Sequence, residues 1–175
     1  MGIFDNLSNL LQQARTGNAS EPEVHAAYDQ VSQSVPQGAL ADGLTHAFQS
    51  DQTPPFEQML MELFSRSTPD QKAGILNRLI AAAGPAGLAQ LRNVLGGAAG
   101  VGPAGMGAGA TVSPQQAQQV PPATVQTVAQ EAARKDPTIM QQAASFYSQH
   151  PTLVKSLGVG ALALIMSHMN QSRRI

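Results

Sequence analysis

Apolar residues recur along this chain with the three- and four-residue spacing that is typical of amphipathic α-helices. No stretch shows the sustained alternation of β-branched and polar residues that predicts a strand. The fold is therefore predicted to be all-α. The predicted inward faces are Val24, Ala27, Tyr28 and Val31; Leu40, Leu44, Ala47 and Phe48; Phe56, Met59, Leu60, Leu63 and Phe64; Ile75, Leu76, Leu79 and Ile80; and Leu88, Leu91, Val94 and Leu95.

Prolines mark where these helices begin, because the first helical N–H has no intrahelical partner and proline lacks that N–H. Ser20 and Glu23 have capping-box spacing, which predicts a helix start at that point. The prolines that each precede a helical pattern are Pro36, Pro54, Pro69, Pro85, Pro114, Pro122, Pro137 and Pro151.

Residues 96–110, with the sequence GGAAGVGPAGMGAGA, are too rich in glycine to carry a core and predict a flexible connector. They divide an N-terminal bundle of about six helices, residues 1–95, from C-terminal helical hairpins at residues 111–175. The connector contains a GxGxxG pattern between Gly100 and Gly105. A dinucleotide site needs a strand before that pattern, whereas a helix precedes it here, so composition is the favoured explanation.

Two internal similarities occur. Asp136 to Met140 is echoed fourteen residues later by His150 to Val154, which fits two consecutive helical hairpins. A fainter match relates Val35-Pro36, Leu40, Ala47 and Asp51 to Val120-Pro121, Val125, Ala132 and Asp136. Helix starts resemble one another, so chance is favoured over duplication for this second match.

The composition removes several classes of chemistry. The chain has no cysteine, which excludes disulfides, thiolate metal sites and a cysteine nucleophile.

His25 and Asp29 share a helical face, but two ligands are too few for a metal site. His150 is expected at a helix cap, and His168 near a helix C-terminus. Neither GxSxG nor SxxK occurs. We therefore expect no enzyme activity, cofactor, metal or small-molecule substrate.

Charge is distributed unevenly, although the net charge is only −1. Residues 1–65 carry eight acidic residues and one basic residue, a net −7, whereas the remainder carries a net +6. Such a chain can fold its ends onto each other, or place the acidic part of one molecule against the basic part of the next. Basic residues are not clustered as nucleic-acid binding requires, so no nucleic-acid partner is expected.

The N-terminus lacks the basic and apolar regions of a secretory signal, which predicts a cytoplasmic protein. The longest apolar run, from Leu157 to Met166 with His168 and Met169 beyond it, is short of the roughly 20 residues that cross a bilayer. Gly158 and Gly160 lie in this predicted last helix, where small residues favour close approach of another helix.

The opening MGIFDNLSNLL, together with Val112-Ser113-Pro114-Gln115-Gln116 leading into helices and a Gly-containing apolar helix, resembles the YidB-like group of small bacterial helical proteins of unknown function. The resemblance covers the opening helix and Val112 to Leu157, with an additional helical block from Val24 to Leu95 between them. It implies a bacterial, cytosolic, helical protein without an assigned activity, and supplies no catalytic residues.

Two terminal helices are apolar enough to need covering: the one from Met1 to Ala14 and the one from Pro151 to Ser172. Both can pack into their own domain; alternatively, one of them docks on a neighbouring subunit. We expect a non-enzymatic assembly protein that self-associates into an oligomer or filament. The alternative is peripheral association of the last helix with an anionic membrane surface. The expected interaction residues are Ile3, Phe4, Leu7, Leu157, Leu162, Leu164, Ile165, Met166 and Met169.

Overall fold

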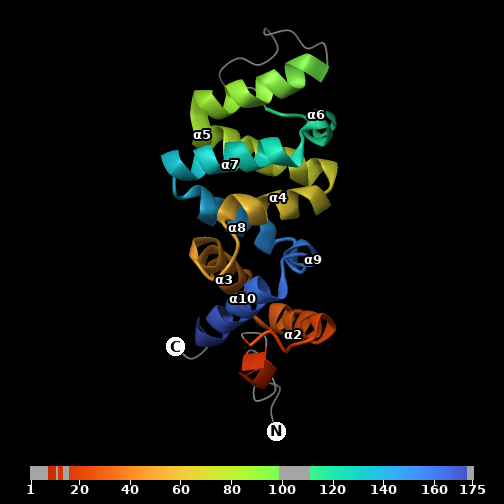
Figure 1. Cartoon of the computed structure of the whole chain (residues 1–175), viewed down its shortest axis with the longest axis vertical. Helices are drawn as coiled ribbons and strands as arrows, with labels where there is room; N and C mark the ends of the chain where they lie inside the picture. Colours follow the sequence, from red (N-terminus) through yellow and green to blue (C-terminus); the bar gives the residue numbers. More distant parts are fainter. Residues whose placement is uncertain (1–7, 11, 14–15, 99–110, 173–175) are drawn as a thin grey trace. The chain divides into compact units, whose positions relative to one another are not determined.

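A computed structural model describes residues 8–10, 12, 13, 16–98 and 111–172 of the chain. These residues form α-helices joined by short loops, and none of them lies in a strand, which confirms the all-α prediction (Figure 1). Ile3, Phe4 and Leu7 lie outside the described residues. The helices are α2 (Glu21–Ser34), α3 (Gln37–Gln49), α4 (Phe56–Arg66), α5 (Pro69–Ala98), α6 (Pro114–Gln119), α7 (Pro122–Lys135), α8 (Ile139–Ser148), α9 (Pro151–Val154) and α10 (Val159–Ser172).

The helices group into two units that do not follow the order of the chain. Unit 1 combines the residues up to Pro55 with those from Ala144 onward, and unit 2 comprises Phe56 to Ala143. This grouping differs from the expected division at residues 96–110. The physical reason is that the apolar last helix needs covering on several sides, and the helices that cover it come from the start of the chain.

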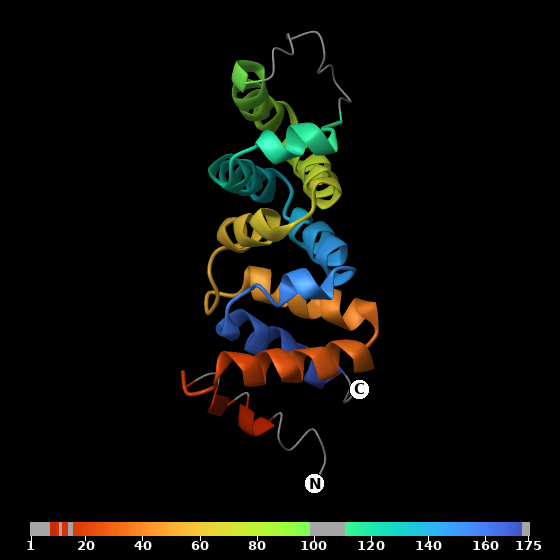
Figure 2. The ribbon, with the colours of Figure 1, turned by 90° about the vertical axis from the view of Figure 1, so that its right-hand side faces the viewer.

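In unit 1, α10 packs against both α2 and α3 (Figure 2). Leu40, Leu44 and Phe48 of α3 are buried, as their spacing predicts, and so are Val24, Tyr28 and Val31 of α2. Ala27 is only partly buried. Apart from Ala27, the periodicity of α2 and α3 therefore predicts their inward faces. The structure shows that these faces pack on α10.

In unit 2, α5 packs against α6 and α7, and α4 also packs against α7. Asn77 of α5 fixes the chain just before α6, because its side chain pairs with both backbone groups of Val112. It accepts a hydrogen bond from the Val112 N–H at 2.7 Å and donates one to the Val112 carbonyl at 3.4 Å. Ser113 then caps α6 in a complete capping box with Gln116.

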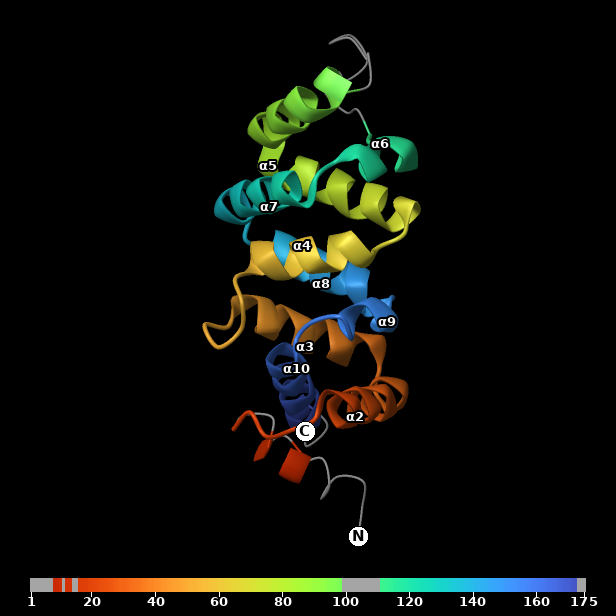
Figure 3. The same ribbon diagram turned by 45° about the vertical axis from the view of Figure 1, so that its right-hand side comes forward.

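Helix α5 changes direction at Gly84, which has φ 66° and ψ −148° (Figure 3). This conformation is open to glycine and strained for other residues, and Pro85 then starts the second segment as its position predicts. Gly87 is needed one turn later, since a Cβ there would lie 2.5 Å from the Cβ of Ala83 and 3.4 Å from Cγ1 of Val128.

Three local predictions need correction. Residues 96–98 belong to α5, so the helix extends into the expected connector, while residues 99–110 and their GxGxxG pattern lie outside the described residues. Ser20 does not form a capping box: its hydroxyl donates to Oε2 of Glu23 at 2.6 Å, and it makes no side-chain cap bond to the backbone. The close approach predicted at Gly158 and Gly160 is not found in the part of the chain that the structure describes, where a Cβ at either would meet nothing within 4 Å.

Candidate interaction surfaces

The expected interaction residues of the C-terminal helix lie mainly inside unit 1. Leu157 is 2% exposed, and Leu162, Ile165, Met166 and Met169 are fully buried. Leu164 is partly exposed. Because α2 and α3 of the same chain pack on α10, these side chains form a core within the chain.

Gly43 of α3 marks the closest approach between α3 and α10. A Cβ on Gly43 would lie 3.0 Å from the backbone oxygen of Ile165 and 3.2 Å from Cγ2 of the same residue. The same Cβ would lie 3.4 Å from Cγ of Met169. The small residue that admits a neighbouring helix is therefore on α3, in a helix whose apolar pattern alone does not single it out.

Lys155, directly after α9, forms an ion pair with Asp29 of α2 at 2.5 Å between Nζ and Oδ2. The two side chains are 26% and 45% exposed, so solvent screens part of their attraction. An acidic residue of the N-terminal part thus meets a basic residue of the C-terminal part within one chain, which is the first of the two arrangements that the charge pattern allows.

The charge division of the sequence does not become a division between the units. Unit 1 contains six acidic and four basic residues, a net −2, and unit 2 contains five acidic and six basic residues, a net +1. The interleaving of the chain brings both ends into unit 1, where the net −5 of residues 1–55 is partly offset by the net +3 of residues 144–175.

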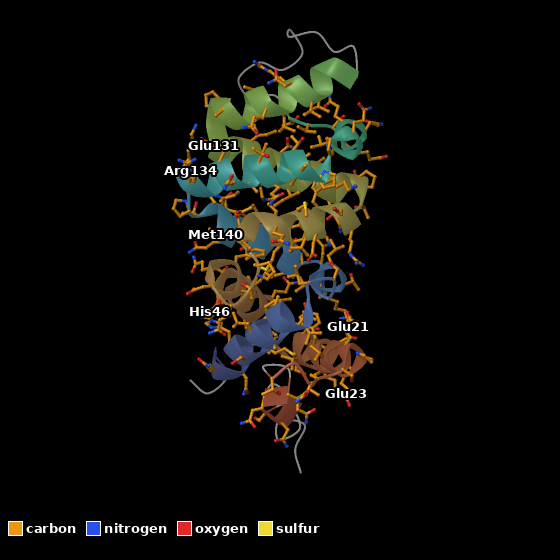
Figure 4. The ribbon with its side chains drawn as sticks, viewed as in Figure 1. Glu21, Glu23, His46, Glu131, Arg134 and Met140 are labelled. Atoms are coloured by element: carbon orange, nitrogen blue, oxygen red, sulfur yellow. The ribbon has the colours of Figure 1, made fainter. Side chains whose placement is uncertain are left out.

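Lys135, near the end of α7, contacts the bend in α5. Its Nζ donates to the carbonyl of Ala83 at 3.0 Å and lies 3.7 Å from Oε1 of Glu131. Ala83 precedes the break at Gly84, so this ammonium contacts α5 where the helix changes direction. Figure 4 shows Glu131 and Arg134 projecting from the same part of α7. Sequence spacing indicates the pair with Glu131 but not the contact with α5.

The histidines of α3 and α10 stack on each other. The rings of His46 and His168 are 4.9 Å apart between centroids, with an interplanar angle of 20°. His150 is the N-cap residue of α9, as expected, and the centroid of its ring lies 5.4 Å from that of Phe146, with an interplanar angle of 63°. Within the described part of the chain, no three or more His, Asp or Glu side chains gather as a metal site requires.

Tyr28 carries a buried hydroxyl without a hydrogen-bond partner among the described residues. Its side chain is fully buried in unit 1. Burial, and to a smaller extent the negative charge of the adjacent Asp29, raise the pKa of this phenol above its usual range. The phenol is therefore neutral throughout the ordinary pH range and acts as a large core side chain.

An open groove of about 300 Å³ lies between α5 and α7 in unit 2. Its lining offers amide and hydroxyl groups and no ionisable side chain. The hydroxyl of Thr127 donates to the carbonyl of Ala123 within α7. Hydrogen bonding is thus the chemistry that this lining provides. The lining residues are Gln90, Asn93, Val94, Ala123, Thr124 and Thr127.

Comparison with protein-family models, with curated proteins and with solved structures gives no match. The resemblance to YidB-like proteins therefore stays a prediction that rests on the residues quoted for it. Among the described residues, no helix combines the length and the apolar character needed to cross a membrane.

Proposed function

We propose that this protein is a non-enzymatic helical assembly protein that self-associates. The observation that carries the proposal is the interleaving of the chain: unit 1 joins α2 and α3 to α10, and unit 2 joins α5 to α6 and α7. In unit 1 these contacts link segments from opposite ends of the sequence, and in unit 2 they link helices that precede and follow residues 99–110. A second copy of the chain carries the same segments, and exchange of identical elements between copies is a low-cost route to oligomers.

The composition supports association. Charged residues make up 12% of the chain and the net charge is −1. A small domain with a net charge near zero has little long-range repulsion between copies. Leu164 also leaves part of an apolar side chain exposed on α10.

Size-exclusion chromatography with multi-angle light scattering tests the proposal, with a concentration series at low and at high salt. We expect a mass above that of the 18.2 kDa chain, increasing with concentration. Negative-stain microscopy then distinguishes a closed oligomer from a filament. A strict monomer at both salt concentrations, up to tens of micromolar, would overturn the proposal.

The second candidate is peripheral membrane association through α10. Its supporting observation is the apolar character of this helix, with Lys155 just before it and Arg173 and Arg174 in the following sequence. In unit 1 the apolar residues of α10 face α2 and α3, so lipid binding requires release of the helix. Flotation with anionic vesicles, compared with neutral vesicles, tests it, and absence of flotation with anionic vesicles removes it.

The YidB-like resemblance extends the proposal to a bacterial, cytoplasmic protein. Self-association needs no cofactor, small-molecule substrate or nucleic acid, and none forms part of the proposal.

A further inference from the structure

Helices α3 and α7 correspond to each other at an offset of 85 residues. Each follows a proline N-cap in nearly the same conformation: Pro36 has φ −60° and ψ 148°, and Pro121 has φ −63° and ψ 145°. Proline is an unusual N-cap, because it has no side-chain acceptor for the helix N–H groups. The buried positions also coincide: Leu40, Gly43, Leu44 and Ala47 in α3 match Val125, Val128, Ala129 and Ala132 in α7.

The sequence around these helices agrees with the same register. Between residues 28–53 and 113–138, seven positions are identical. An amphipathic period alone produces matching apolar residues, but these identities include polar residues and the proline. The identical pairs are Gln30 and Gln115, Gln33 and Gln118, Val35 and Val120, Pro36 and Pro121, Ala47 and Ala132, Asp51 and Asp136, and Thr53 and Thr138.

The correspondence continues into the next helices of each half. Helix α4 begins at the buried Phe56 and α8 begins at the buried Ile139. At the same offset of 83, Leu60 and Phe64 match Ala143 and Tyr147, which are also buried. The shift from 85 to 83 falls in the loops between helices, where chain length varies most readily.

The final helices correspond after one further shift. Gly74-Ile75-Leu76 in α5 matches Gly160-Ala161-Leu162 in α10 at an offset of 86. Four buried positions of α5 then coincide with four of α10. These are Ile75, Leu76, Leu79 and Ala83 against Ala161, Leu162, Ile165 and Met169. Residues 21–83 thus align with residues 114–172, and these added coincidences favour duplication over the chance match expected from the sequence alone. The two segments are called the first and the second repeat.

The packing relates the two repeats crosswise. Helix α10 of the second repeat packs on α2 and α3 of the first, and α5 of the first repeat packs on α6 and α7 of the second. Each repeat therefore places its last helix on the first two helices of the other. This matches the reciprocal exchange seen in a swapped dimer of identical chains, here within one polypeptide.

We propose that the chain is a tandem duplication with exchanged repeats, and that self-association pairs the first repeat of one copy with the second repeat of another. This inference rests on the proposed self-association and specifies how it occurs. The contacts made between copies are the ones already present within a copy, so the two forms differ mainly in chain connection. Effective concentration within one chain opposes the exchange, and high protein concentration favours it.

Single-cysteine variants test the exchange, because the natural chain contains no cysteine. His46→Cys on α3 and His168→Cys on α10 replace the two stacked rings. The two full-length variants are unfolded together, refolded at high concentration and treated with a short bismaleimide. A chain with one cysteine has no partner within itself, so a 46–168 cross-link requires α3 of one copy to lie on α10 of another.

Two controls complete the experiment. The double variant His46→Cys/His168→Cys, refolded at low concentration, should cross-link within one chain and shows that the positions are in reach. Mixing His46→Cys with Gln130→Cys, an exposed position of unit 2, measures cross-linking by collision. We expect the 46–168 mixture to yield several times more covalent dimer than the 46–130 mixture.

The outcomes separate this inference from the proposed function. Excess 46–168 dimer supports exchange. If light scattering shows an oligomer while the 46–168 mixture gives no more dimer than the control, exchange is overturned and self-association stands. If the protein is monomeric throughout, both are overturned.

Discussion

Lys155 donates a hydrogen bond to Asp29 across 126 positions of sequence, at a distance of 2.5 Å. The pair joins α2 to the residue that follows α9, so it links the two ends of the chain that build unit 1. Its contribution to stability is limited by solvent, because both side chains are partly exposed.

A double-mutant cycle with Asp29→Asn and Lys155→Met should give a coupling free energy of about 0.5–1 kcal/mol. The coupling free energy is expected to be this small because solvent partly screens the hydrogen-bonded ion pair. Urea unfolding at low salt and at high salt measures it, and the coupling should decrease with salt. A coupling of zero at low salt would mean that the pair contributes nothing to the stability of the protein.

Two glycines of α3 should respond to alanine in opposite directions. Gly38→Ala should stabilise the protein, by up to about 1 kcal/mol, because alanine has the higher helix propensity and a Cβ there meets no described residue within 4 Å. Gly43→Ala should destabilise it by about 1–2 kcal/mol, because its Cβ would press on the backbone of Ile165. Thermal unfolding of both variants checks this, and equal shifts would contradict the close packing of α3 and α10.

Hydrophobic periodicity predicts most of the core. Every residue of the predicted face of α4 is buried, as are Leu40, Leu44, Ala47 and Phe48 of α3. Ile80, before the bend of α5 at Gly84, and Leu88 and Val94, after it, are only partly buried, whereas Leu91 and Leu95 are buried as predicted.

Periodicity does not predict which helices pair. It indicates that α10 is apolar on several sides and must be covered, but the sequence does not distinguish which of the other apolar helix faces cover it. The small residue that decides the packing of α10 is Gly43, on another helix, and the polar contact between Asn77 and Val112 joins residues 35 positions apart. Such complementarity depends on three-dimensional arrangement, which is why the division into units was not predicted.

Asn77→Ala should lower the free energy of unfolding by about 1–2 kcal/mol, because both hydrogen bonds to the Val112 backbone are lost in a partly buried setting. Asn93→Ala, an exposed position of the same helix, is the matched control and should change stability by less than about 0.5 kcal/mol. Urea unfolding measures both variants. An equal effect of the two substitutions would show that the Asn77 contact contributes nothing specific.

Tyr28→Phe should stabilise the protein by about 1 kcal/mol near neutral pH, because it removes a buried hydroxyl that has no hydrogen-bond partner among the described residues. The advantage should increase at alkaline pH. The pKa of Tyr28 is raised in the folded protein, whereas a tyrosine in the unfolded chain ionises at about pH 10. Above that pH the unfolded state releases a proton that the folded state retains, so the natural protein loses stability as the pH rises.

Chemical unfolding of both proteins between pH 7 and about pH 11 measures this difference, since the other titrating groups are common to the two. A difference that stays constant over the range would mean that the Tyr28 phenol reaches solvent in the folded state.

Cleavage of the connector should leave the protein associated. A protease site placed within residues 99–110 divides the chain into one piece ending with α5 and another beginning with α6. Unit 1 needs α2, α3 and α10, and unit 2 needs α4 to α7, so each unit contains helices from both pieces. We expect the two pieces to elute together from a size-exclusion column, with the helical signal of the uncut protein in circular dichroism.

Elution in urea should separate the two pieces and prove that cleavage was complete. Two separately eluting, folded pieces would instead indicate consecutive domains joined by the connector, because only that arrangement lets each piece bury its apolar faces alone.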